Sequence, residues 1–176
     1  MILQIDFAIL DFVQKHFRSE VCDAIMKFVT ALGNYGAFYI VTTLILLIYA
    51  KTRKVGAKLA ISQIAGAIIC SVILKNVVGR IRPFDIRDFD LLINAPKDFS
   101  FPSGHTLHAF VCASVIYTAN RKWGIAAYIL AFVMGFSRIY LYVHYPSDVL
   151  AGAVLGVAIG YGVSKTFDYY KKRKAN

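Results

Sequence analysis

Charged residues are scarce in this sequence, and no long polar segment interrupts it. Only 17% of the 176 residues are charged, whereas 58% are hydrophobic. A soluble domain of this length needs a wetted exterior, and this composition leaves too little polar surface for one. The scarcity excludes an ordinary soluble enzyme and predicts that lipid covers the remaining apolar surface. Because the composition does not change along the chain, we expect one membrane-embedded domain over residues 1–176.

The N-terminus lacks the features of a secretory signal peptide, and cysteines are few. Asp6 and Asp11 lie within the apolar opening residues, and no small-residue cleavage site follows, so we expect this segment to remain in the mature protein. Cys22, Cys70 and Cys112 are an odd number, and two of them lie within long apolar runs. This arrangement predicts small buried apolar residues and no disulfide.

Apolar runs of membrane-crossing length make up most of the chain. Five such runs, separated by charged residues or by glycine and proline, cover residues 35–50, 56–79, 104–119, 123–142 and 147–166. Residues 2–17 show helical apolar spacing interrupted by polar side chains, which predicts an amphipathic helix at the interface. Residues 20–32 form a short helical segment and add a span only if they continue the helix before them. The sequence thus predicts an all-α integral membrane bundle of about six transmembrane helices, five of them from these runs.

Basic residues outnumber acidic residues, 20 to 10, and they follow the sides of the membrane. Eleven of them lie in alternate connections between the runs: Lys51, Arg53, Lys54, Lys58, Arg121, Lys122, Lys165, Lys171, Lys172, Arg173 and Lys174. By the positive-inside rule these connections and the C-terminus are cytoplasmic. The closing basic residues are therefore predicted to anchor the topology, and we expect no nucleic-acid partner.

The opposite, extracytoplasmic side receives basic residues that the positive-inside rule disfavours. They are Lys75, Arg80, Arg82, Arg87, Lys97 and Arg138, and some of them require another explanation. If each run crosses the membrane once, four helix ends lie on this face: the end of 56–79, the start of 104–119, the end of 123–142 and the start of 147–166. Because the polar residues suited to chemistry lie at these four ends, we expect one shared site there.

Two of these ends offer groups that bind anions. Lys75 and Arg82 lie near the end of the 56–79 run, where either one alone would be an ordinary interfacial anchor. Ser103 is a good N-cap and Gly104 permits close approach, so the first N–H groups of the next helix would cradle an anion. His105 then points from the first helical turn into the same space.

The other two ends complete a set suited to phosphoryl transfer. Arg138 ends one helix, His144 lies in the connection, and Asp148 falls in the first turn of the next helix. An aspartate beside a histidine orients the ring and stabilises the imidazolium, which suits a nucleophile, so we expect His144 to attack phosphorus. The cations would neutralise the charge on the phosphoryl oxygens, and the other histidine would protonate the leaving oxygen.

Three motifs resemble, in order and spacing, the signatures of the type 2 phosphatidic acid phosphatase family, which is related to glucose-6-phosphatase and vanadium haloperoxidases: Lys75-(six residues)-Arg82-Pro83, Pro102-Ser103-Gly104-His105, and Ser137-Arg138-(five residues)-His144-(three residues)-Asp148. The resemblance implies metal-independent dephosphorylation, with no cofactor, through a phosphohistidine on His144 oriented by Asp148. It also implies that His105 is the acid for the leaving group and then the base for water. The phosphate would be held by Lys75, Arg82, Ser103, Gly104 and Arg138.

We expect the substrate to be a lipid phosphate or diphosphate, with undecaprenyl diphosphate first and phosphatidylglycerophosphate and phosphatidic acid close behind. A phosphotransferase and a non-catalytic anion-binding membrane protein are the alternatives. A zinc site built from His105, His108, His144 and Asp148 is a further alternative, which three nearby cations disfavour, so His108 is predicted to line the groove.

Two features allow more than one interpretation. The repeated glycines of the last run could drive a homodimer, or they could pack helices within one subunit: Gly152, Gly156 and Gly160. The loop of residues 84–101 contains several acids and two basic residues, and it either covers the site or is a solvated connection.

Overall fold

The computed structural model describes the backbone of residues 1–175 and side chains up to residue 173; Asn176 lies outside the described residues. Over residues 1–175 the chain is helical and holds no strand. The elements are α1 (Ile2–Phe17), α2 (Glu20–Leu32), the 3₁₀ turn η1 (Asn34–Gly36), α3 (Ala37–Ile48), α4 (Arg53–Ala67), the π-helical segment η2 (Ile68–Leu74), α5 (Lys75–Val78), α6 (Pro83–Ile86), α7 (Gly104–Ala119), α8 (Arg121–Tyr140) and α9 (Pro146–Ala175).

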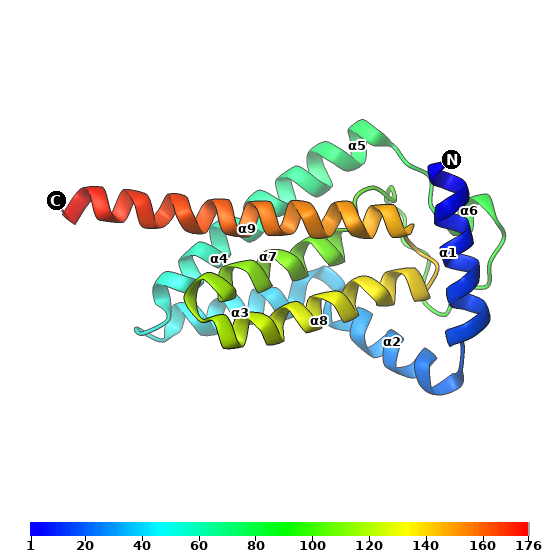
Figure 1. Ribbon diagram of the computed structural model, residues 1–176, viewed down its shortest axis with the longest axis horizontal. Helices are drawn as coiled ribbons and strands as arrows, with labels where there is room; N and C mark the ends of the chain where they lie inside the picture. Colours follow the sequence, from blue (N-terminus) through cyan, green and yellow to red (C-terminus); the bar gives the residue numbers. More distant parts are fainter. Residues whose placement is uncertain (176) are drawn as a thin grey trace.

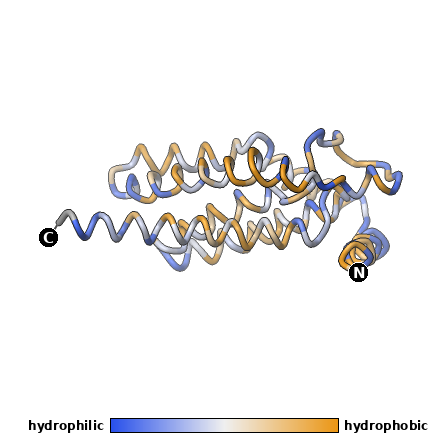
Figure 2. The backbone as a smooth tube through the Cα atoms, turned by 90° about the horizontal axis from the view of Figure 1, so that it is seen from above, coloured by the Kyte–Doolittle hydropathy of each residue, from blue (hydrophilic) through white to orange (hydrophobic). Residues whose placement is uncertain are grey.

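The helices form an elongated bundle with α7 at its centre. Helices α3, α4, α7, α8 and α9 run along the bundle, and α1 lies across one end of it (Figure 1). Seen from above, α1 is viewed end-on, while the C-terminal part of α9 extends beyond the opposite end (Figure 2). Helix α7 packs most extensively on α8 and α9, and its side chains are buried almost continuously from Thr106 to Val115.

Close packing between α7 and α9 depends on the glycines of α9. A Cβ atom at Gly152 would lie 2.7 Å from the backbone oxygen of Ser103, and one at Gly156 would lie 2.5 Å from that of Leu107. A Cβ atom at Gly160 would lie 2.8 Å from Cβ of Ser114. The glycine face therefore lets α9 approach α7 within one subunit. Of the two alternatives for these glycines, the homodimer is not supported, because α7 already occupies this face.

Within the described part of the chain, three helical segments are long and apolar enough to cross a membrane: Arg53–Ile86, Arg121–Tyr140 and Pro146–Arg173. Large apolar side chains such as Ile64, Val72 and Leu130 point outward from them, as a lipid-covered surface requires. Helix α7 is apolar but has only 16 residues, about 24 Å of helix, and is enclosed by its neighbours. The chain is thus a multi-pass membrane protein, and the count of about six spans stays a prediction.

The N-terminal segments connect differently from what we expected. Arg18 is extended and Ser19 caps α2, accepting a hydrogen bond from the Cys22 backbone N–H at 3.3 Å, so α2 does not continue α1. Instead, α2 and the η1–α3 segment qualify together as one span bent by 47°. The bend occurs where Tyr35 and Gly36 have φ angles of 54° and 68°. The 35–50 run contributes a helix of only 12 residues, so it completes a span with 20–32 rather than forming one alone.

Candidate active site

The four helix ends that carry the motifs meet at one end of the bundle. A cavity of about 1030 Å³ opens there, and six of the eight predicted site residues line it: Lys75, Arg82, Gly104, His105, Arg138 and His144. The remaining two, Ser103 and Asp148, are fully buried. Segments that the crossing count placed on one face therefore contribute to the wall of one cavity.

His144 lies in the short connection between α8 and α9 and is 2% exposed. Its Nε2 atom is 3.3 Å from Nη1 of Arg82. Because a guanidinium can only donate, Nε2 is the nitrogen of the ring that carries no proton. Its Nδ1 atom is 3.6 Å from Oδ2 of Asp148 and 3.5 Å from Oγ of Ser100. Burial, followed by the charges of Arg82 and Arg138, lowers the pKa of His144 well below its ordinary value. The neutral ring thus offers a nucleophilic nitrogen toward the cations.

Lys75, Arg82 and Asp98 form a group on the cavity wall that we call the front cluster. The Lys75 ammonium is 2.9 Å from one Asp98 carboxylate oxygen and also donates to the backbone oxygen of Phe99. The Arg82 guanidinium donates to the other carboxylate oxygen at 2.6 Å and to the backbone oxygen of Val143 at 2.5 Å. Burial would raise the pKa of Asp98, but the hydrogen bonds and charges of the two cations lower it to about 2. A carboxylate thus occupies the space between the two cations.

Arg138, the third predicted cation, is 2% exposed near the end of α8. It donates a hydrogen bond to the hydroxyl of Thr30 on α2. Within the part of the chain that the structure describes, its Nε–H has no hydrogen-bond partner. A buried guanidinium with an unused donor on the cavity wall fits an anionic ligand.

His105 lies in the first turn of α7 and contacts the bend between α2 and α3. Its Nε2 atom is 3.2 Å from Oδ1 of Asn34, and its backbone oxygen accepts from the Tyr39 hydroxyl at 3.5 Å. A Cβ atom at Gly33 would lie 2.4 Å from the ring, so glycine makes room for His105. The bent span therefore helps to position this histidine.

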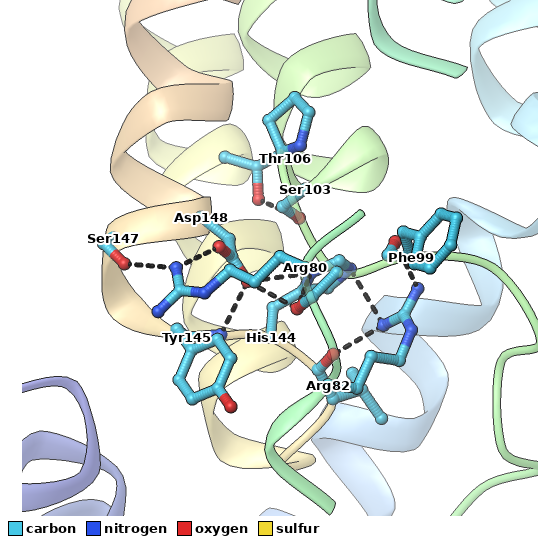
Figure 3. Close-up of polar contacts among 12 residues, drawn as sticks. Arg80, Arg82, Phe99, Ser103, Thr106, His144, Tyr145, Ser147 and Asp148 are labelled. Carbon is cyan, nitrogen blue, oxygen red and sulfur yellow. Dashed lines mark hydrogen bonds and ion pairs between the residues drawn. The ribbon is translucent and has the colours of Figure 1, made fainter. Parts of the chain in front are cut away.

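Ser103 is the N-cap residue of α7, as predicted, but its hydroxyl makes no capping bond to the helix backbone. Its Oγ atom is instead 2.9 Å from Oγ1 of Thr106 (Figure 3). The Ser103 N–H donates to the backbone oxygen of Asp148 at 3.1 Å. A Cβ atom at Gly104 would meet only Cys70 Sγ, at an ordinary 3.7 Å. Packing does not require glycine at this position.

Behind His144, three residues form a group that we call the rear cluster: Asp6, Arg80 and Asp148. Arg80 donates to Oδ1 of Asp148 at 2.6 Å and to Oδ2 of Asp6 at 2.7 Å. The other oxygen of Asp148 accepts from Ser100 Oγ at 2.5 Å and from the Tyr145 N–H at 3.0 Å. Figure 3 shows Arg80 and Asp148 beside His144. Asp148 is therefore held by several donors, as a buried carboxylate requires.

The motifs gave no role to Arg80, Asp6, Ser100, Asp98 or Asn34, which the structure brings to the site. The sequence did single out Arg80, because the predicted topology puts this basic residue on the side that the positive-inside rule disfavours. Asp98 belongs to the acidic loop, which covers part of the cavity wall as one of the two interpretations expected. For Asp6, the sequence showed only a polar interruption of an amphipathic helix.

The alternative metal site is not formed by the side chains. Within the described residues, no three histidine, cysteine, aspartate or glutamate side chains are gathered in a way that could hold a metal ion. His108 lines the cavity, and its Nδ1 atom is 2.5 Å from Oε1 of Gln63. This placement matches the groove-lining role predicted for it.

Several curated proteins and solved structures that are similar to this chain are named as phosphatases. An undecaprenyl-diphosphatase of Sulfolobus acidocaldarius is 39% identical over 74% of this chain and 65% of its own length, slightly under two thirds. Undecaprenyl-diphosphatase BcrC of Bacillus subtilis is 34% identical over 82% of this chain and 74% of its own length. A crystal structure of a transmembrane PAP2 type phosphatidylglycerolphosphate phosphatase from Bacillus subtilis superimposes with a TM-score of 0.79 at 28% identity, covering 96% of this chain and 86% of that one.

The structure of LpxE from Aquifex aeolicus gives a TM-score of 0.80 at 26% identity and covers 90% of this chain and 94% of that one. Residues 55–172, which contain all three motifs, match the PAP2 superfamily. The match covers about two thirds of the sequence and agrees with the family that the motifs predicted. This chain belongs to the PAP2 superfamily.

Proposed function

We propose that this protein is an integral membrane phosphatase that removes the terminal phosphate from a lipid phosphate or diphosphate. The observation that carries the proposal is the convergence of Lys75, Arg82, Arg138, His105 and His144 on one cavity of about 1030 Å³. Family membership and the names of the relatives agree with the prediction of a PAP2-type lipid phosphatase. We further propose that the whole chain acts as a single domain whose site faces the extracytoplasmic side, with a cytoplasmic C-terminus.

In the proposed reaction, Nε2 of His144 attacks the phosphorus of the terminal phosphate. The bond from phosphorus to the leaving oxygen breaks; this is the lipid oxygen of a monophosphate or the bridging oxygen of a diphosphate. His105, protonated at this stage, donates a proton to that oxygen. His105, now neutral, then takes a proton from water, whose oxygen attacks the phosphohistidine. Inorganic phosphate leaves and His144 is restored. Lys75, Arg82 and Arg138 stabilise the charge on the phosphoryl oxygens throughout.

An apolar groove next to the site supports a lipid substrate. It has a volume of about 820 Å³ and lies between the bent α2–α3 span and helices α7 and α8. Its lining includes Leu32 and Met134, near the His105 contact at Gly33, and Trp123 at the cytoplasmic start of α8. A hydrocarbon chain in this groove would keep the headgroup in the cavity. Undecaprenyl diphosphate is our first choice, in line with the relatives named undecaprenyl-diphosphatase.

The test is phosphate release by the purified protein in detergent with EDTA present. The panel consists of undecaprenyl diphosphate, phosphatidylglycerophosphate and phosphatidic acid. We expect release from at least one of these lipids and a loss of at least about 10³-fold in the His144→Ala variant, because the nucleophile is gone. Full hydrolysis by His144→Ala would refute the proposed nucleophile. Transfer of the phosphoryl group to an added acceptor alcohol, with no inorganic phosphate released in its absence, would indicate a phosphotransferase. Activity that returns only with zinc would restore the metal alternative.

A further inference from the structure

The rear cluster joins α1 to the aspartate that faces His144. Asp6 and Asp148 are 2% and 0% exposed, although both are acidic. Asp6 accepts from Arg80 and also from Ser147, whose N–H and hydroxyl lie 2.9 Å and 2.6 Å from its two oxygens. Arg80 in turn donates to the Ser147 hydroxyl at 2.7 Å (Figure 3). Each acid therefore has its own donors, and Arg80 bridges them.

The charges of this cluster do not cancel. Two carboxylates and one guanidinium leave one net negative charge, held by Asp6, Arg80 and Asp148 together. If Asp6 were neutral, Arg80 would offset the charge of Asp148 and leave none for the ring of His144. In a buried site such charges are weakly screened, so this difference acts strongly on a neighbouring imidazole.

His144 depends on that negative charge because its other charged neighbours are mostly cationic. The groups that face it besides Asp148 are Lys75, Arg82, Arg138 and His105, with Asp98 on the far side of Arg82. In the proposed reaction, the attack by Nε2 places a positive charge on the ring while Nδ1 keeps its proton toward Asp148. A net negative rear cluster stabilises this charge as it develops.

We propose that Arg80 and Asp6 are positioning residues for the nucleophile. Arg80 fixes the Asp148 carboxylate beside His144, and Asp6 balances Arg80 so that Asp148 acts on the ring with its full charge. The inference rests on the proposed function of His144. It also assigns α1 a part in catalysis, although α1 lies outside residues 55–172 that match the family.

The test compares pH profiles of kcat and kcat/KM for Asp6→Asn, Arg80→Gln and the double variant, with farnesyl diphosphate in detergent micelles as the probe. The acid limb of each profile, where activity falls as the pH decreases, reports protonation of His144. Asp6→Asn makes the cluster neutral, so this acid limb should move to lower pH by about one unit, and kcat should fall about tenfold. Arg80→Gln makes the cluster doubly negative, so its limb should move to higher pH while kcat also falls. The double variant restores one net negative charge, and its limb should return near the wild-type position.

Arg87 and Asp11 provide the matched control. They form a second ion pair, at 2.9 Å, between α1 and the residue that follows α6, but this pair is about half exposed. The side chain of Asp148 accepts hydrogen bonds from Arg80, Ser100 and Tyr145 instead. Arg87→Gln and Asp11→Asn should keep kcat within about twofold and leave the limb unmoved. Thermal unfolding in detergent shows whether each variant is folded. If only one of the two variants Asp6→Asn and Arg80→Gln folds, the direction in which its acid limb shifts decides whether the inference holds.

The inference is overturned if the limb of Asp6→Asn stays at the wild-type pH, or if both single variants shift in the same direction. A merely structural role would reduce yield or stability without opposite shifts. Failure of the proposed function has a different result, since the wild type would then release no phosphate or would not depend on His144.

Discussion

The front and rear clusters lie on either side of His144 and differ in how firmly they hold their acids. In the front cluster, the Asp98 side chain is 57% exposed and belongs to a loop. In the rear cluster, the side chains of Asp6 and Asp148 are 3% and 0% exposed, and both belong to helices. Both clusters pair carboxylates with cations, but only the front one lines the cavity.

The difference suggests separate tasks. A phosphate can replace an exposed carboxylate, because Asp98 regains water when it leaves its two cations. A buried carboxylate has no such exchange, since leaving it unpaired costs several kcal/mol. We therefore expect changes in the front cluster to alter kcat/KM or KM, because they act on the phosphate. Changes in the rear cluster should lower kcat and shift the pH profile.

The largest effect should come from the front cation that contacts the nucleophile. Arg82→Gln removes the charge beside Nε2 of His144 and should lower kcat/KM by about 10²- to 10³-fold, because a preorganised donor for the phosphoryl oxygens is lost. Steady-state phosphate release measures kcat/KM. Arg87→Gln, which removes an exposed arginine, is the control variant. A decrease of less than about tenfold would break the assignment of Arg82 to the transferred phosphate.

Removing the exposed acid should have a smaller and opposite effect. Asp98→Asn leaves Lys75 and Arg82 without their competing carboxylate, so KM should fall by about two- to fivefold with kcat nearly unchanged. Asp88→Asn, a change of another exposed acid in the same loop, is the control and should leave KM unaltered. An increase in KM for Asp98→Asn would mean that Asp98 supports binding, and the two tasks could no longer be separated.

The smallest effect concerns pH. The pKa of Asp98 is lowered to about 2, so its carboxylate stays ionised and paired with the two cations at every pH well above 2. The ion pairs are lost only as the pH falls toward 2. The ratio of KM between wild type and Asp98→Asn should therefore stay constant, within about twofold, from about pH 5 to pH 8. A ratio that changes within this window would show that another group controls the competition.

The motif residues could be predicted because each carries its chemistry within a short stretch. Arg138, His144 and Asp148 follow one another closely, and the crossing count alone places them on the same face as Lys75 and His105. Membrane thickness fixes which helix ends share a face, so this part of the site needs no side-chain geometry.

The rest depended on contacts between segments far apart in the chain. Asp6 and Arg80 are 74 residues apart, and His105 and Asn34 are 71 apart, with no spacing pattern linking either pair. Composition also could not show that the 20–32 segment joins the following helix, because Tyr35 and Gly36 change the direction of the chain without ending the apolar run. The sequence likewise left two roles for the α9 glycines, a homodimer or packing within one subunit. The structure shows that α7 packs against them.

The sequence by itself determined that this protein is a helical membrane protein of the PAP2 superfamily, because an apolar composition requires lipid and the three motifs specify the reacting groups. The tertiary structure decided how those groups are supported: the buried partners of Asp148, the acid between Lys75 and Arg82, and the bent span against His105. The physical reason is that buried charges must find partners, and which partners they find depends on how helices pack across the whole chain.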